Sequence, residues 1–303
     1  MCKSSKSNFL NRSKCRRLSF LAITIGILAI PNLSHSQVSP KYKNVVYAII
    51  DGKELRLDIY MPPAMASPHL LIWVHGGAWR YGTKESVPKV FVENGFAIAS
   101  LDFRQSTEAR FPAQVHDIKA AIRFLRAKGS EYGYRSDKFA IAGSSSGGHL
   151  AALVGVSNGN KELEGTIGNY LNQSSDVQAI VDYFGASNLM TILSQSTPFG
   201  LNMRRPALKL LLGASPDSVK TVAQLASPVM HVDKSDPPLL IFHGDQDPQM
   251  PINQSHELEG QYKKLGLDVE FDVVHGAAHG GDAFFAGEYL EKVLKFLKRT
   301  LGN

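Results

Sequence analysis

The sequence contains little cysteine, and none beyond residue 15. Cys2 and Cys15 both lie within the first 36 residues, so a chain that begins after them has neither a disulfide bond nor a thiol nucleophile. Without cysteine it also lacks the usual ligands of structural zinc sites, and no dinucleotide-binding glycine motif or P-loop is present. We therefore expect a protein that depends on its hydrophobic core and needs no cofactor or metal.

The first 36 residues differ in composition from the rest. Six Lys and Arg residues precede the apolar run 18–30, and the small-residue segment 34–36 follows it. This order is typical of a secretory signal peptide. The run is shorter than the roughly 20 residues that span a bilayer, so an uncleaved membrane anchor is the weaker alternative. We expect residues 1–36 to be cleaved and the protein to be secreted or periplasmic, with no stable membrane anchor.

Residues 37–303 also lack an excess of positive charge. Residues 1–36 hold six of the 33 Lys and Arg residues and none of the 27 Asp and Glu residues. The remainder therefore carries 27 of each sign and no formal net charge. A basic excess would indicate nucleic acid or an anionic membrane as a partner. We expect no nucleic-acid partner.

Short apolar runs alternate with helical patterns along the rest of the chain. Asp51-Gly52, a strong hairpin signal, joins the first two runs, 45–50 and 55–60. Further predicted strands are 70–74, 97–101, 139–142, 179–183, 239–242 and 269–274. Predicted helices are 113–127, 149–156, 252–265 and 284–301. This alternation predicts an α/β fold with a mostly parallel eight-stranded sheet, an antiparallel hairpin at its start and helices on both faces.

Residues 185–227 interrupt the alternation. Proline and glycine punctuate short helical pieces throughout this segment, which is typical of irregular connections. We expect a small cap-like insertion over the carboxyl-terminal edge of the sheet. No internal repeat is visible, so residues 37–303 are expected to form one domain.

A glycine-flanked serine follows the predicted strand 139–142. Residues 143–147 read GSSSG. A nucleophilic serine on a sharp strand-to-helix turn needs glycine two positions before and after it, because side chains there would collide with neighbouring backbone. Only Ser145 has this spacing, which makes it the candidate nucleophile. The alternative is a Gly/Ser loop that begins a helix and does no chemistry.

A second glycine-rich loop follows the predicted strand 70–74. Residues 75–79 read HGGAW. Small residues in a tight loop let backbone N–H groups approach the oxyanion formed during acyl transfer. We assign these donors to Gly77, Ala78 and Ser146. His75 and Trp79 are expected to shape the loop.

A serine nucleophile needs a base, and the base needs an acid to orient it. Asp247 is the preferred acid, because the loop after strand 239–242 carries it over the edge where sites of open α/β folds lie; Asp245 is the alternative. His279, in a glycine-rich loop before the last helix, is the preferred base, and His275 is the alternative.

Three other polar residues are expected to have structural roles. Asp282 is predicted to cap the last helix, as a short acidic side chain does at a helix N-terminus. His116 and His149 lie beside apolar residues in predicted helices. We expect these two histidines to be packed rather than to bind a ligand.

With these residues in place, the chain resembles the α/β-hydrolase superfamily in its esterase and lipase branch. Residues 75–84 (HGGAWRYGTK), 102–104 (DFR) and 111–118 (FPAQVHDI) are similar to secreted bacterial carboxylesterases related to the bifunctional acetylxylan and feruloyl esterases. The hormone-sensitive-lipase family is also similar, but Ala78 replaces a glycine of its motif and the segment before residue 75 is short for that family's helical cap.

The resemblance implies a serine carboxylesterase that forms an acyl-enzyme through Ser145, His279 and Asp247. It also implies short-acyl or polysaccharide-linked acetyl and feruloyl esters as substrates. Three alternatives stay open. They are a lipase that uses residues 185–227 as a lid or acyl groove, a secreted peptidase of the prolyl-oligopeptidase type, and an inactive hydrolase fold that only binds.

Overall fold

The computed structural model describes residues 38–63 and 65–302. The expected signal peptide lies outside these residues. The strands are β1 (Tyr42–Ile50), β2 (Lys53–Tyr60), β3 (His69–Val74), β4 (Ala97–Leu101), β5 (Arg135–Ser144), β6 (Ala179–Tyr183), β7 (Leu239–Gly244) and β8 (Val269–Val274). They form one sheet in the order β1-β2-β4-β3-β5-β6-β7-β8. β1, β2 and β4 pair antiparallel and all other neighbours pair parallel, which confirms the predicted sheet.

The helices include the four predicted from the sequence and several short ones. They are α1 (Val90–Glu93), α2 (Ala113–Tyr132), α3 (Ser146–Gly155), α4 (Lys161–Glu164), α5 (Ile192–Gln195), α6 (Pro198–Leu212), α7 (Lys220–Leu225), α8 (Asn253–Leu265) and α9 (Gly287–Leu301). The turns η1 (Pro216–Ser218), η2 (Pro228–Met230) and η3 (Asp282–Phe285) are 3₁₀ helices. Among the described residues, no helix combines the length and apolarity that crossing a membrane requires.

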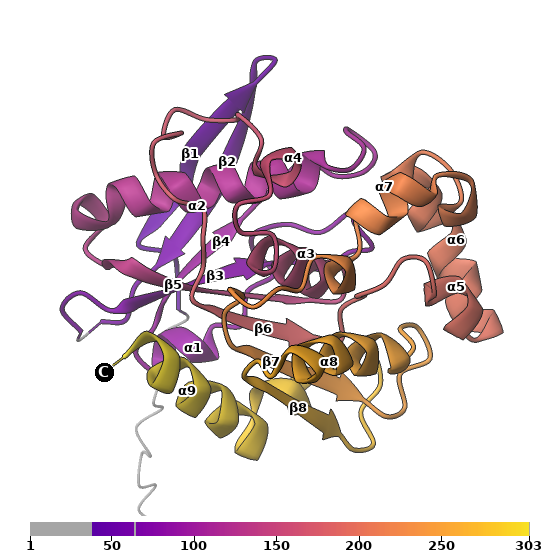
Figure 1. Ribbon diagram of the computed structural model, residues 1–303. Helices are drawn as coiled ribbons and strands as arrows, with labels where there is room; N and C mark the ends of the chain where they lie inside the picture. Colours follow the sequence, from indigo (N-terminus) through magenta and orange to yellow (C-terminus); the bar gives the residue numbers. More distant parts are fainter. Residues whose placement is uncertain (1–37, 64, 303) are drawn as a thin grey trace, which may run out of the picture. The chain divides into compact units, whose positions relative to one another are not determined.

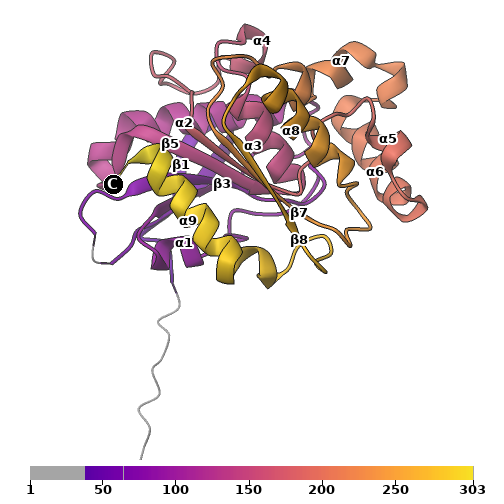
Figure 2. The same ribbon diagram turned by 60° about the horizontal axis from the view of Figure 1, so that its bottom comes forward.

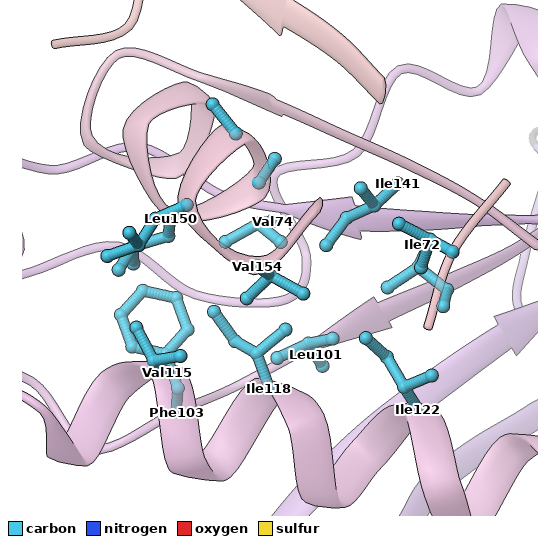
Figure 3. Packing of buried hydrophobic residues seen from close by; sticks show 14 of the residues in the cluster. Ile72, Val74, Leu101, Phe103, Val115, Ile118, Ile122, Ile141, Leu150 and Val154 are labelled. Carbon is cyan, nitrogen blue, oxygen red and sulfur yellow. The ribbon is translucent and has the colours of Figure 1, made fainter. Parts of the chain in front are cut away.

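Helices cover both faces of the sheet because its central strands are apolar on both sides. α2, α3 and α8 lie on one face and α1 and α9 on the other (Figures 1 and 2). Alternate residues of a strand point to opposite faces. In β3, Ile72 and Val74 therefore pack under α2 and α3, as Figure 3 shows, whereas Leu71 and Trp73 join the core beneath α1 and α9. Burial on both faces explains the uninterrupted apolar run.

The segment between β6 and β7 contains α5, α6, η1 and α7, gathered at one end of the sheet (Figure 1). α6 is its longest helix. Pro198 occupies the first turn of α6, and the Thr197 hydroxyl accepts a hydrogen bond from the Gly200 N–H, so the helix begins with a regular N-cap. This helix lies at the end of the sheet where the parallel strands finish.

The prediction that Asp282 caps the last helix is wrong. Asp282 begins the 3₁₀ turn η3, and α9 starts only at Gly287, after Ala286 in extended conformation. The physical reason is the burial of Phe284, whose ring lies 4.8 Å from that of Phe184. The turn η3 holds this ring in the core before the helix begins, and Asp282 lines a pocket instead.

The turn between β5 and α3 is unusually tight. Ser145 has φ +55° and ψ −120°, and its N–H donates to the Tyr183 carbonyl at 2.9 Å. A Cβ on Gly143 would lie 2.3 Å from the Gly147 carbonyl oxygen, and one on Gly147 would lie 2.1 Å from the Val74 carbonyl oxygen. Both glycines are therefore required by the close approach of α3 to β3 and β5.

This packing predicts opposite effects for two Gly→Ala substitutions. Gly147→Ala is expected to lower the free energy of unfolding by about 1–3 kcal/mol or more, because the methyl group overlaps rigid backbone. Gly260→Ala is the control. Gly260 lies within α8 with no atom near its Cβ position, so this variant should gain about 0.4–1 kcal/mol. Urea unfolding of both variants measures the difference, and equal midpoints would contradict the packing described.

Candidate active site

Three loops at the carboxyl ends of parallel strands bring Ser145, His279 and Asp247 together. The Ser145 Oγ lies 2.8 Å from Nε2 of His279. On the other side of the ring, Nδ1 lies 2.6 Å from Oδ2 of Asp247. A carboxylate can only accept, so Nδ1 carries the proton and Nε2 is left to accept from the serine hydroxyl. This arrangement suits removal of the Ser145 proton.

Asp247 is held as a carboxylate by its surroundings. Its side chain is only 1% exposed. Oδ1 accepts the backbone N–H groups of Gln249 and Met250 at 2.8 and 2.9 Å. Burial by itself would raise the pKa of Asp247, but the side-chain contacts from His243 and His279 outweigh it and hold the pKa well below its usual range. The acid therefore stays ionised beside His279.

His243 is a supporting residue that the sequence analysis did not single out. It is fully buried on β7, with Nε2 3.0 Å from the Met250 carbonyl oxygen and 3.4 Å from Oδ2 of Asp247. Nδ1 lies 2.7 Å from the Ser255 hydroxyl. The carbonyl fixes Nε2 as a donor, so this N–H also points toward the acid. A histidine at the end of a buried strand is the only sequence signal for this role.

The two alternative residues pair with each other instead. Asp245 Oδ2 lies 2.9 Å from Nδ1 of His275, and the His275 side chain is 80% exposed. The hydrogen bond from His275 lowers the pKa of Asp245. This exposed pair has no contact with Ser145 in the part of the chain that the structure describes. The geometry favours Asp247 and His279 as the acid and base.

The loop after β3 lines the pocket beside Ser145. Gly77 has φ +125° and Ala78 has φ +51°, and both line the same pocket as Ser145. In the described chain neither N–H donates to a backbone carbonyl. The N–H of Ser146, the first residue of α3, belongs to the unpaired first turn of that helix. Three donors are thus available to a developing negative charge.

His75 and Trp79 shape this loop, in agreement with the sequence analysis. The His75 ring stacks on Phe103 with centroids 4.6 Å apart. Trp79 Nε1 donates to Nδ1 of His149 at 2.9 Å, and His149 Nε2 lies 2.7 Å from the Ala226 carbonyl oxygen. Burial lowers the pKa of His149 to about 4, so this packed histidine is neutral.

The second histidine assigned a structural role is also packed. His116 Nε2 lies 2.9 Å from the Glu162 carbonyl oxygen, and its ring occupies the space that a side chain at Gly165 would need. Within the described residues, no group of His, Cys, Asp and Glu is placed to hold a metal ion.

A pocket of about 590 Å³ opens beside Ser145 and His279. Aromatic residues Trp73, Phe184 and Phe285 form part of its wall, and α6 contributes Met203 and Arg204. The segment predicted as an insertion thus reaches the pocket. Arg204 is a second residue that the sequence analysis missed, because residues 185–227 carry no motif that would single it out.

Comparisons with known proteins place these features in a family. A family model described as BD-FAE matches residues 57–262. Two similar curated relatives come from Mycobacterium tuberculosis. The esterase LipQ is 27% identical in an alignment that covers 85% of this chain and 62% of LipQ. The esterase LipC is 28% identical in an alignment that covers 73% of this chain and 54% of LipC. The chain therefore spans less than two thirds of these relatives.

Two similar solved structures are also esterases. A truncated carbohydrate esterase from gut microbiota is 33% identical with a TM-score of 0.77, covering 86% of this chain and 95% of its own. The thermophilic esterase Est2 of Thermogutta terrifontis is 26% identical with a TM-score of 0.68, covering 86% and 92%. The match over residues 57–262 and the shared sheet show that the chain has the α/β-hydrolase fold and belongs to the BD-FAE family.

Proposed function

We propose that the protein is a carboxylic ester hydrolase with Ser145 as nucleophile, His279 as general base and Asp247 as the orienting acid. The observation that carries the proposal is the hydrogen-bonded row from Asp247 through His279 to Ser145. It ends at a pocket lined by Gly77 and Ala78, whose N–H groups donate to no backbone carbonyl of the described residues. The esterase names of similar proteins support the same reaction class. Geometry and comparison thus agree on ester hydrolysis.

The proposed reaction has two acyl-transfer steps. Ser145 Oγ attacks the ester carbonyl carbon while His279 Nε2 takes its proton, and the oxyanion lies against the N–H groups of Gly77, Ala78 and Ser146. His279 then protonates the leaving alcohol, and a water molecule releases the acid from the acyl-enzyme. Asp247 remains ionised and stabilises the imidazolium. One oxyanion donor typically contributes about 2.7–4 kcal/mol to such a transition state.

We further propose short-acyl or polysaccharide-linked esters, such as acetyl or feruloyl groups on xylan, as the substrates. A carbohydrate esterase among the similar structures supports this choice. A lipase that binds long acyl chains is the alternative, since α6 could line an acyl groove. The buried guanidinium of Arg204 in the pocket wall argues against it, because a long alkyl chain offers no hydrogen-bond acceptor to the guanidinium, whereas a sugar hydroxyl does.

The nucleophile assignment predicts the effect of Ser145→Ala on 4-nitrophenyl esters. The wild-type protein should hydrolyse the acetate and butyrate readily and the palmitate poorly. Ser145→Ala should lower kcat by about 10³-fold or more, because among the described residues only the Ser145 hydroxyl is hydrogen-bonded to His279. Release of 4-nitrophenolate measures both. Full activity of the variant would exclude Ser145, and a preference for palmitate would favour the lipase alternative.

Matched carboxamide variants separate the two candidate acids. Asp247→Asn should lower kcat on 4-nitrophenyl acetate by about 10³- to 10⁴-fold, because the amide no longer holds the productive tautomer of His279. Asp245→Asn, in the exposed pair with His275, should leave kcat near the wild-type value. Steady-state kinetics of the two variants decides, and the reverse order of effects would assign Asp245 as the acid.

Release of acids from plant polysaccharide tests the substrate class. The wild-type protein should free acetate from acetylated xylan or ferulate from feruloylated xylan, and Ser145→Ala should free neither. Chromatography of the released acids provides the measurement. Hydrolysis of 4-nitrophenyl acetate without any release from either xylan would restrict the protein to small soluble esters and contradict the polysaccharide assignment.

A further inference from the structure

Arg204 is a buried cation in the wall of the pocket beside Ser145. It lies on α6 and is only 2% exposed. Its Nε and Nη2 atoms are shielded from solvent and have no hydrogen-bond partner in the part of the chain that the structure describes. Buried charged groups in proteins are normally paired. The guanidinium is therefore incomplete without a ligand.

In the part of the chain that the structure describes, Arg204 forms no ion pair with Asp247 or with Asp282, the carboxylate that lines the same pocket. Burial lowers the pKa of Arg204 to about 10, opposed by the charges of Asp247 and Tyr81, so the side chain stays protonated at neutral pH. The Asp247 oxygens already accept from His279 and from two backbone N–H groups. Lys89 and Asp282 also line the pocket, so its wall carries one further charge of each sign.

Another arginine of this chain shows what the free groups would bind. Nε and Nη2 of Arg104 hold the Asp117 carboxylate through contacts of 2.7 to 3.2 Å. These two nitrogens form one edge of the guanidinium, which matches the two oxygens of a carboxylate. Among the described residues, nothing accepts a hydrogen bond from the same edge of Arg204. Because this edge is shielded from solvent, a carboxylate reaches it only when the Arg204 side chain rotates toward the pocket.

We propose that Arg204 is a specificity residue that binds a carboxylate carried by the ester substrate. The proposal rests on the proposed ester hydrolysis and adds a preference for acid-bearing esters over neutral ones. A neutral hydroxyl group would satisfy one N–H of the guanidinium but leave its charge uncompensated. A carboxylate satisfies both.

Two pairs of esters, matched in the number of carbon atoms, test the preference in the wild-type protein. One pair places the carboxylate on the acyl side (monomethyl glutarate against methyl pentanoate), and the other on the alcohol side (4-acetoxybutanoate against butyl acetate). In at least one pair, kcat/KM for the anionic ester should exceed that for the neutral ester by about tenfold or more, the usual value of a charge-assisted hydrogen bond. A preference for the neutral ester in both pairs would overturn the proposal without any variant.

Three variants connect the preference to Arg204. Arg204→Met should abolish the ratio between anionic and neutral esters, and Arg204→Lys should restore part of it. Arg205→Met, at the exposed neighbour on the same helix, is the control and should keep the wild-type ratio. A loss of folded protein lowers both activities equally, so the ratio reports binding of the carboxylate alone. An unchanged ratio in Arg204→Met would overturn the proposal.

The neutral esters distinguish a failure of the Arg204 proposal from a failure of the esterase proposal. Hydrolysis of methyl pentanoate or butyl acetate without any Arg204-dependent preference would reject the role of Arg204 and leave the esterase proposal in place. A protein that hydrolyses none of the four esters and no 4-nitrophenyl acetate would reject both the esterase proposal and the role of Arg204.

Discussion

The position of Ser145 depends on how closely α3 can approach β3. The backbone of Ser145 adopts a left-handed conformation that side chains rarely occupy, at a typical cost of about 1–3 kcal/mol. Close packing of Gly147 against the Val74 carbonyl and the hydrogen bond from Ser145 N–H to Tyr183 maintain it. This turn places the hydroxyl above the sheet, where His279 and the loop at Gly77 can reach it. Every other part of the proposed site is arranged around this one strained residue.

The sheet then determines which residues meet. β5, β7 and β8 run parallel, so the loops that follow them end at the same edge and bring Ser145, Asp247 and His279 within hydrogen-bonding distance. Buried groups around Asp247 complete the arrangement. The backbone N–H groups after it and the side chain of His243 keep the carboxylate ionised and oriented. α6 adds Arg204, whose positive charge lies in the wall of the pocket beside Ser145.

Local sequence patterns are sufficient to predict the sheet and the sharp turn between strand and helix at Ser145. Strands such as β3 are apolar on both faces and are recognisable as short uninterrupted runs, and the spacing of Gly143 and Gly147 singles out one serine. Features that depend on tertiary packing are not visible in the sequence. Asp282 has the chemistry of a helix cap, but burial of Phe284 against Phe184 delays α9. No sequence motif distinguishes Arg204 from other basic residues, because its place in the pocket depends on how α6 packs. Single-turn helices such as α1 are too short to show a helical periodicity of apolar residues.

Covalent labelling of Ser145 tests the central claim most directly. An aryl or alkyl fluorophosphonate reacts with a serine only where a base activates it and N–H groups stabilise the new oxyanion, so the reagent reports the whole site at once. Digestion and mass spectrometry of the labelled protein should find one phosphonyl group, on the peptide that contains Ser145. A protein that hydrolyses esters yet carries the label on another residue, or takes up none, would contradict the account.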